Sequence, residues 1–331
     1  MGKCAFITGV YGQDGSLLAE YLLAKKYRVV GLVSKVRHSY ASLVPVEIIE
    51  ADIADPTTIR ELFLKVRPDE FYHLAAAHHS SEQKTEADMR AEMLRVNFLS
   101  TQIILDKLLE TTPSCRFFYA GSSQMFTPDS SITTIDERTP YRPTSYYGMT
   151  KAASAMLIDF LRRERQLWGV TAILFNHEST RRDAKFLSRK ITLSVAEISN
   201  KDEACRADSK LPIRDISART DWSAATDFVR AFHASLQADT AMDYVLASGE
   251  VHSVENFLEE AFQVAELDWR RYVHAEQTSD GGRPCLQGNP QRARDILGWK
   301  PHKSFSILVR EMVEHDLAEK SPDSANSKCE F

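Results

Sequence analysis

Cys4-Ala-Phe-Ile-Thr-Gly-Val-Tyr-Gly-Gln-Asp-Gly-Ser16 joins a short apolar run to a helical pattern through three glycines, Gly9, Gly12 and Gly15. The apolar run is typical of a buried strand, and the pattern at 16–26 places leucines on one helix face. Gly9 permits a tight turn, Gly12 lets backbone approach a diphosphate, and Gly15 lets the helix pack on the strand. Three glycines could also form an ordinary turn, but their place between the first strand and the first helix favours a dinucleotide site at the helix N-terminus.

Short apolar runs continue to alternate with helical patterns over the first 175 residues. Strands are expected at 28–33, 46–50, 70–75, 116–120 and 170–175, and the longest helices at about 85–110 and 144–164. Such alternation predicts an α/β fold with a doubly wound parallel sheet of the Rossmann type. We expect a dinucleotide-binding domain at 1–175. A smaller, mostly helical substrate-binding lobe with some return to the sheet is expected at 176–319, and a polar tail at 320–331.

Composition argues against several classes of function. The formal net charge is -5, so no overall basic field would attract nucleic acid. The five cysteines include no Cys-x-x-Cys pair, which indicates reduced thiols and neither a disulfide framework nor a zinc site. The first strand has no basic and apolar leader before it, and no apolar stretch is long enough to span a membrane. We expect a cytoplasmic protein with no nucleic-acid partner, no membrane association and no metal.

The loop after the second strand bears on the identity of the dinucleotide. A carboxylate there would bind a ribose 2′-hydroxyl, but the sequence has Lys35 and Arg37. Two cations suit a 2′-phosphate and favour NADP over NAD, although both could be solvated loop side chains. Asp52, after the third strand, is placed to bind the adenine amino group, to cap the next helix, or to do both.

Tyr147 and Lys151 lie four residues apart, and therefore on one face of the helix expected at 144–164. A tyrosine is a poor base at neutral pH, but a lysine cation and a positively charged nicotinamide both favour its phenolate. Ser122, after the fifth strand, can orient a substrate oxygen. The spacing alone is common on helices, and the upstream glycine loop and serine favour catalysis.

The chain resembles the extended short-chain dehydrogenase/reductase family, and within it the GDP-mannose 4,6-dehydratases, from Phe6 to about Leu317. The resemblance is carried by 7–16, by Asp221-Trp222 with 227–229, by 247–253 and 297–301, and most specifically by Leu174-Phe-Asn-His-Glu-Ser-Thr-Arg-Arg182 with 189–192. It implies that bound NADP oxidises C4 of a nucleotide-linked hexose such as GDP-mannose, after which water is lost from C5 and C6.

The resemblance also implies which residues form the site. Ser122, Tyr147 and Lys151 would act on the sugar. The cofactor would contact Gly9, Tyr11, Gly12, Gln13, Asp14, Gly15, Lys35, Arg37, Asp52, Ile53, Leu74, Ala75, Ala76, Tyr147, Lys151 and His177. The sugar nucleotide would contact His79, Ser122, Asn176, Glu178, Arg189, Lys190, Arg219 and Arg283. Asn176 could instead serve only as a cap at the end of a strand.

The sequence departs from the family at the acid/base. The family has a glutamate two residues after the catalytic hydroxyl, where this chain has Gln124. A neutral amide cannot accept a proton, and general acid–base catalysis contributes roughly 10²–10⁴ in rate. Glu178, His177 or His79 could replace the glutamate, although His79 could be an ordinary loop histidine and Glu178 could only pair with a nearby arginine.

If no group replaces the glutamate, the reaction stops at C4. The enzyme would then be a C4 epimerase or a C4 oxidase/reductase. A third possibility is a degenerate subunit that only binds a nucleotide sugar, which the intact pair of Tyr147 and Lys151 argues against.

Two further departures concern the nucleotide and the assembly. Thr220 stands before Asp221 where the family has an arginine, which leaves Arg219 and Arg283 to bind the diphosphate. Guanine is expected from the resemblance alone. The loop after Lys35 is shorter than the family's, where it helps tetramers to form, so we expect a homodimer through the helices at 85–110 and 144–164, with a tetramer as the alternative.

Overall fold

A seven-stranded parallel sheet forms the centre of the computed structural model, which describes residues 2–36, 45–78, 86–128, 134–277 and 285–320. Its strand order is β11-β7-β5-β4-β1-β2-β3. The strands are β1 (Cys4–Thr8), β2 (Arg28–Val33), β3 (Glu47–Glu50), β4 (Glu70–His73), β5 (Arg116–Ala120), β7 (Gly169–Leu174) and β11 (Tyr244–Leu246). The chain leaves β1 in one direction and returns to β4 on its other side, which is the switch point where such sheets bind ligands.

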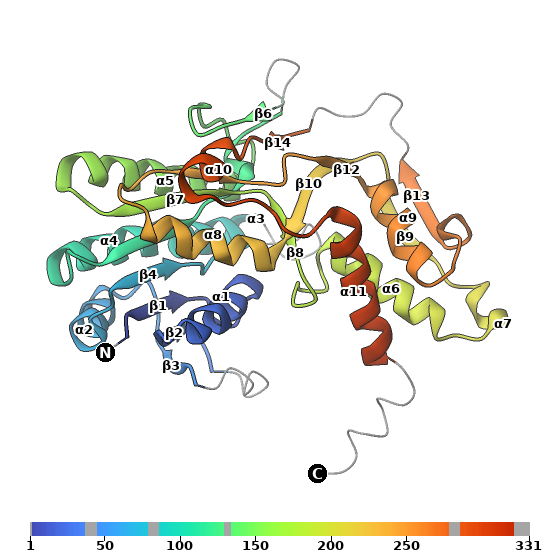
Figure 1. Ribbon diagram of the computed structural model, residues 1–331, viewed down its shortest axis with the longest axis horizontal. Coiled ribbons are helices and arrows are strands. Elements are labelled where there is room, and N and C mark those ends of the chain that lie inside the picture. Colours follow the sequence, from blue (N-terminus) through green and yellow to red (C-terminus); the bar gives the residue numbers. More distant parts are fainter. Residues whose placement is uncertain (1, 37–44, 79–85, 129–133, 278–284, 321–331) are drawn as a thin grey trace, which may run out of the picture.

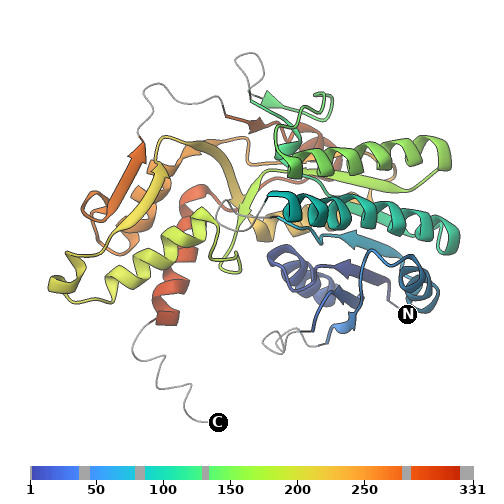
Figure 2. The ribbon, with the colours of Figure 1, turned by 180° about the vertical axis from the view of Figure 1, so that it is seen from behind.

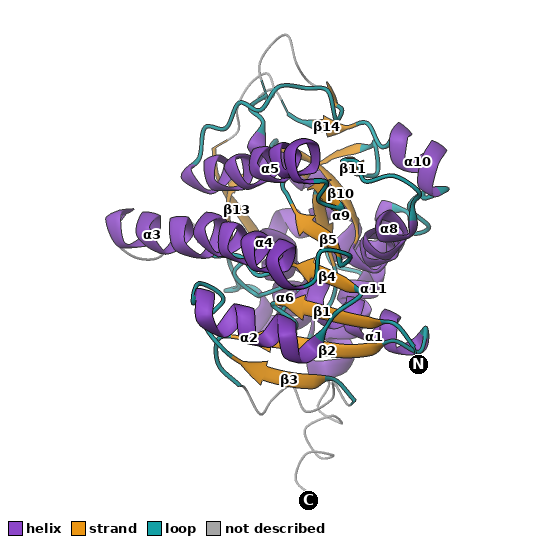
Figure 3. Ribbon diagram, turned by 90° about the vertical axis from the view of Figure 1, so that its left-hand side faces the viewer, coloured by secondary structure: helices purple, strands orange, loops and turns teal. Residues whose placement is uncertain are grey.

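Helices cover both faces of the sheet, as Figure 3 shows. One face carries α1 (Gln13–Ala24), α8 (Ala225–Gln237) and α10 (Gln291–Leu297), whose buried side chains form one core with the sheet. The other carries α2 (Pro56–Val66), the continuous run α3 (Glu86–Met93), η2 (Leu94–Leu99) and α4 (Ser100–Thr111), and α5 (Tyr146–Arg165). The expected doubly wound Rossmann fold is confirmed.

A smaller lobe continues from the carboxyl ends of the central strands (Figures 1 and 2). Only one residue separates β7 from β8 (Asn176–Glu178), which pairs with β10 (Arg219–Ala224) and, through it, with β12 (Val251–Ser253). The lobe's core lies among α6 (Leu187–Ser199), α9 (Val254–Val264) and α11 (Phe305–Lys320). Its remaining elements are α7 (Glu203–Arg206), η4 (Trp269–Arg271) and the pair β9 (Leu211–Asp215) and β13 (Val273–Gln277).

The two parts are interwoven along the sequence. Strand β11 comes after the lobe's first three strands and returns to the edge of the large sheet beside β7. A short pair, β6 (Thr134–Ile135) with β14 (Gln287–Gly288), joins segments that are far apart in the chain. None of the described helices has the length and apolarity that crossing a bilayer requires.

Candidate active site

The glycine loop after β1 forms a cradle that has no room for side chains. Gly9 has a φ of +73°, and a Cβ on it would lie 3.0 Å from the backbone of Ala75. A Cβ on Gly15 would lie 2.3 Å from the Gly9 carbonyl oxygen. Gly12 precedes α1 and donates its N–H to the same oxygen at 2.9 Å. The backbone is therefore open to close approach by a diphosphate at the positive end of α1.

The two side chains that follow Gly12 tie this loop to β8. The His177 ring contacts Asp14 Oδ2 at 2.9 Å through Nε2 and the Phe175 carbonyl oxygen at 2.7 Å through Nδ1. Both partners are acceptors, so the ring donates from both nitrogens and is the charged imidazolium. Gln13 adds bonds to the His177 carbonyl oxygen at 3.0 Å and from Ser179 Oγ at 2.8 Å.

The mostly buried pair of Asp14 and His177 shifts the pKa of each member. Burial alone would raise the pKa of Asp14, but the charge and hydrogen bond of His177 outweigh it and lower the pKa. Burial alone would lower the pKa of His177, and Asp14 reverses this, so that the pKa is raised. Each member of the pair thus stabilises the charge of the other, and their hydrogen bond joins the cofactor loop to β8, the first strand of the lobe.

Among the remaining predicted cofactor residues, Leu74 and Ala75 lie against the cradle. Thr8 Oγ1 accepts the N–H groups of Leu74 and Ala75, each at 3.1 Å, which fixes the segment after β4 against Gly9. Ala76 continues this segment and is exposed. Tyr11 and Ile53 are partly buried and pack against the cores on opposite faces of the sheet.

The residues expected to distinguish NADP from NAD lie at the ends of β2 and β3. Lys35 is exposed, and the next residue, Val36, donates its N–H to Glu50 Oε2 at 2.9 Å, so a carboxylate lies near this cation. Arg37 lies outside the described residues. Asp52 pairs with Arg95. Asp52 is not the cap of the next helix, because Asp55 caps α2.

Helix α5 positions the catalytic pair. The Ser145 hydroxyl accepts the Gly148 N–H at 3.0 Å and caps the helix, which places Tyr147 in its first turn and Lys151 one turn later. Lys151 Nζ lies 5.7 Å from the centroid of the Tyr147 ring and donates to the Ala120 carbonyl oxygen at 2.8 Å. Only 1% of Lys151 is exposed, and burial lowers its pKa to about 7.

Burial raises the pKa of Tyr147 to about 12, and two neighbours oppose this rise. The larger opposing effect is the charge of Arg182, and the smaller is a hydrogen bond with Ser122. The structure thus brings Ser122, Tyr147 and Lys151 together, and it adds Arg182 as a cation that stabilises the phenolate.

Arg182 is a site residue that we did not single out from the sequence. Its guanidinium lies 3.6 Å from the ring centroid of Phe186, and its Nε lies 3.2 Å from Glu178 Oε2. The paired arginines at the end of the 174–182 segment were the available signal, but nothing local indicated that the second one approaches Tyr147.

Asn97 is a second residue that the sequence analysis missed. It lies in η2, a π-helical segment within the expected helix at 85–110. Its carbonyl oxygen accepts from Ser154 Oγ at 2.8 Å and Thr101 Oγ1 at 3.0 Å, and its side chain binds both backbone groups of Ala77. These bonds hold α5 and the segment after β4 against η2, the turn that contains Asn97. Segments of π-helix are frequent at functional sites.

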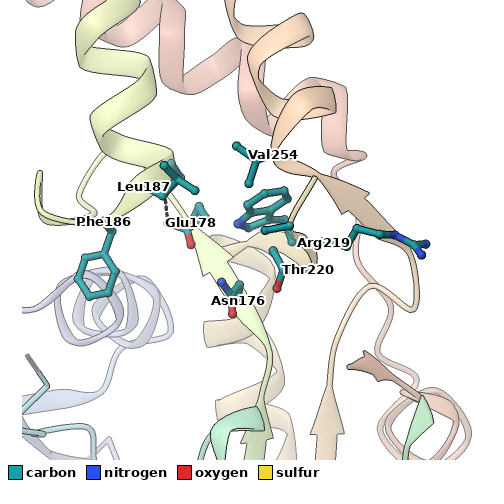
Figure 4. A pocket seen from close by; sticks show the side chains of 10 residues that line it. Asn176, Glu178, Phe186, Leu187, Arg219, Thr220 and Val254 are labelled. Carbon is teal, nitrogen blue, oxygen red and sulfur yellow. Dashed lines mark hydrogen bonds between the residues drawn. The ribbon is translucent and has the colours of Figure 1, made fainter. Parts of the chain in front are cut away.

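A pocket with about 570 Å³ of empty space, part of it open to solvent, lies between β8, β10 and the start of α6. Asn176 and Thr220 lie next to each other at its base, with Phe186 on one side and Arg219 on the other (Figure 4). Its remaining lining residues are Glu178, Leu187, Ser188, Ala218, Trp222 and Val254. The pocket thus brings together Asn176, Glu178 and Arg219 of the predicted substrate residues.

Two other predicted substrate residues, Arg189 and Lys190, are not among the described residues that line the pocket. Arg189 forms an ion pair with the buried Asp316 of α11, and Lys190 donates to the Pro212 carbonyl oxygen at 3.2 Å. His79 and Arg283 lie outside the described residues.

Gln124 lies in η3 (Ser123–Met125), the turn that follows β5. It is exposed, its side-chain oxygen accepts the Ser145 hydroxyl at 3.3 Å, and its backbone oxygen touches the first turn of α5, where a Cβ on Gly148 would lie 2.0 Å away. The amide is therefore held beside the cap of the catalytic helix.

Residues 6–312 match the family described as GDP-mannose 4,6 dehydratase. The chain belongs to this family. It is 34% identical to GDP-mannose 4,6 dehydratase 2 of Arabidopsis thaliana, over 95% of this chain and 87% of that protein. It is also 34% identical to the human GDP-mannose 4,6 dehydratase, over 96% of this chain and 93% of that protein. The protein is thus an enzyme of the short-chain dehydrogenase/reductase type in a lyase family.

Solved structures of lower identity share the fold. A dTDP-glucose 4,6-dehydratase of Bacillus anthracis superposes with a TM-score of 0.80 at 16% identity, covering 97% of this chain and 98% of that one. A UDP-glucose 4-epimerase of Thermotoga maritima gives 0.80 at 18% identity, covering 94% and 98%.

Proposed function

We propose that this enzyme oxidises C4 of a GDP-linked hexose, GDP-mannose or a close relative, by means of tightly bound NADP, and then eliminates water between C5 and C6. The observation that carries the proposal is the position of Tyr147. It lies beside Ser122 and Lys151, close enough to Asp14 of the cradle for that charge to act on the phenol. It also contacts His78, whose ring packs on Phe186 of the pocket wall.

The chain's own residues handle the proton and the orientation of the sugar. Tyr147 takes the proton of the C4 hydroxyl, and Ser122 holds the C4 oxygen through its hydroxyl. Arg182 stabilises the phenolate by charge. Lys151 lies one helix turn away, with its Nζ 5.7 Å from the centroid of the Tyr147 ring. When bound, NADP would accept the hydride that leaves C4 and would supply it again at C6 after water is lost, while C5 takes a proton from solvent. The product is then the 6-deoxy-4-keto sugar, and the cofactor ends oxidised, as it began. Asn176 and Arg219 line the pocket, which supports assigning them to the nucleotide part of the substrate.

The residues of the loop fit a dinucleotide, because Gly9 and Gly15 leave the backbone exposed where any Cβ would collide. Lys35 favours the 2′-phosphate of NADP over the free hydroxyl of NAD, while Glu50 lies close enough to weaken this preference. NADP remains our proposal for the cofactor.

Incubation of the purified enzyme with GDP-mannose in deuterated water tests the proposed function. We expect the protein to purify with NADP, and the product to be a 6-deoxy-4-keto sugar nucleotide with deuterium at C5, identified by NMR and mass spectrometry. Tyr147→Phe should lower turnover at least about 100-fold, because it removes the proton acceptor. If the product keeps its C6 hydroxyl, water is not eliminated. If no nucleotide sugar reacts, the proposed oxidation of C4 is wrong.

A C4 epimerase or C4 oxidase/reductase is the second candidate. The observation that favours it is Gln124, whose neutral amide lies beside the cap of α5 and cannot exchange a proton with the sugar. The same experiment separates the two, because this candidate forms a 4-keto or C4-inverted product that keeps its C6 oxygen.

We also propose a homodimer through α5 and the η2–α4 run, which lie side by side on the outer face of the molecule (Figure 2). Large apolar side chains are exposed on this face: Leu94, Leu99, Met149, Met156 and Phe160. An apolar patch across two adjacent helices is typical of a surface that pairs with a second copy to form four packed helices.

A further inference from the structure

Loss of water from the proposed sugar needs a group that exchanges protons at C5 and C6. The ketone at C4 acidifies the neighbouring C5 proton, and the C6 hydroxyl departs only if it gains a proton. Gln124 can do neither, because its amide is neutral. The assignment of this acid/base rests on the proposed function.

Three ionisable groups of the site, Glu178, His177 and Lys151, are held by partners in the structure. Glu178 accepts the Ser188 hydroxyl at 2.6 Å and faces Arg182 Nε at 3.2 Å. Both nitrogens of His177 bind acceptors, and Lys151 is bound to a backbone carbonyl. Each of these groups would lose a buried partner if it took part in proton transfer at the sugar.

His78 lies between the catalytic tyrosine and the wall of the pocket. Its ring centroid is 4.8 Å from that of Tyr147, with the planes at 81°, and 5.5 Å from that of Phe186. Phe186 itself lines the pocket. A sugar whose C4 oxygen reaches Tyr147 from this pocket therefore passes beside the imidazole, and C5 is bonded directly to C4.

We propose that His78 is the acid/base that carries the proton from C5 to the departing C6 hydroxyl. A neutral ring nitrogen accepts the C5 proton, the electrons of the C5–H bond form a C5–C6 double bond, and the C6–O bond breaks. The protonated ring then gives this proton to the departing hydroxide, water leaves and the ring is neutral again. Imidazole suits both transfers because it titrates near neutral pH.

The test follows C4 oxidation and C5 proton exchange separately, with GDP-mannose and NADP in deuterated water. Nicotinamide absorbance reports C4 oxidation, and NMR of the recovered sugar reports deuterium at C5. His78→Phe keeps an aromatic ring against Tyr147, and His78→Gln keeps polarity. We expect both variants to lose C5 exchange at least about 100-fold and to keep C4 oxidation within a few-fold.

A rescue variant and a matched control complete the test. Gln124→Glu added to His78→Gln should restore C5 exchange, because a carboxylate then stands near the site. His233→Gln should change nothing, since that histidine of α8 packs against Tyr21 and Tyr27, on the face of the sheet opposite α5.

Four results would overturn the proposal. C5 exchange at the wild-type rate in His78→Phe excludes His78 as the acid/base, and a failed rescue shows that the loss is a packing effect. If the wild-type enzyme oxidises C4 without C5 exchange, the inference falls while C4 oxidation stands. If the wild-type enzyme never reduces the nicotinamide with GDP-mannose, both proposals fall.

Discussion

At the scale of single residues, Arg182 sets how readily Tyr147 loses its proton. Its charge opposes the burial that raises the pKa of Tyr147 to about 12. Arg182→Gln should raise this pKa further, so the acid limb of the kcat profile should move upward by about one pH unit, which lowers kcat at neutral pH about 10-fold. Arg182→Lys keeps the charge and should move the acid limb less.

The neighbouring arginine offers a matched control for this pH profile. Arg181 donates to Ser16 Oγ at 3.1 Å and to Glu20 at 2.7 Å. Arg181→Gln should therefore leave the acid limb in place. An unchanged limb in Arg182→Gln would show that its charge does not act on Tyr147.

At the scale of elements, the mostly buried pair of Asp14 and His177 fastens α1 to β8. His177→Asn should cost about 2–3 kcal/mol of unfolding free energy, because it leaves the mostly buried Asp14 carboxylate without its charged partner. The double variant Asp14→Asn with His177→Asn should cost less, since no unpaired charge remains. Chemical denaturation of the three proteins measures both differences, and equal costs would contradict this account.

The same pair predicts how stability depends on pH. The folded-state pKa of His177 is raised, so the stability it contributes is fully present below the unfolded value and is lost as pH rises through the higher folded value. The pKa of Asp14 is lowered, so its contribution is lost as pH falls through that lower value. The difference in unfolding free energy between wild type and His177→Asn should therefore shrink on the alkaline side, and a constant difference would exclude a charged pair.

At the scale of the whole molecule, the sequence patterns predicted those features that depend only on residues close together along the chain. Apolar runs gave the strands of the large sheet, and the glycine loop and the spacing of Tyr147 and Lys151 are local features. The π segment at η2 is different, because it depends on acceptor and donor groups that α5 brings to Asn97. The ion pair of Arg189 with Asp316, and the approach of Arg182 to Tyr147, require the lobe to be packed.

The apolar face of α5 gives a prediction about assembly. Met156 is 60% exposed and Phe160 is 50% exposed, one turn apart on this helix. Because burying them drives association, a charge in their place should weaken the dimer at least about 100-fold, since unpaired buried charge is costly. Light scattering after size-exclusion chromatography should show a dimer for the wild type and a 37.4 kDa monomer for Met156→Glu with Phe160→Glu.

Ile296, on α10, provides the control for this surface. It is 49% exposed but lies on the opposite face of the sheet from α5. Ile296→Glu should leave the dimer intact, because a new charge on a surface that stays in water costs little. If Ile296→Glu separates the subunits while the α5 variant does not, the copies meet through the α10 face. Helix α5, which carries Tyr147, would then lie outside the contact between the two copies.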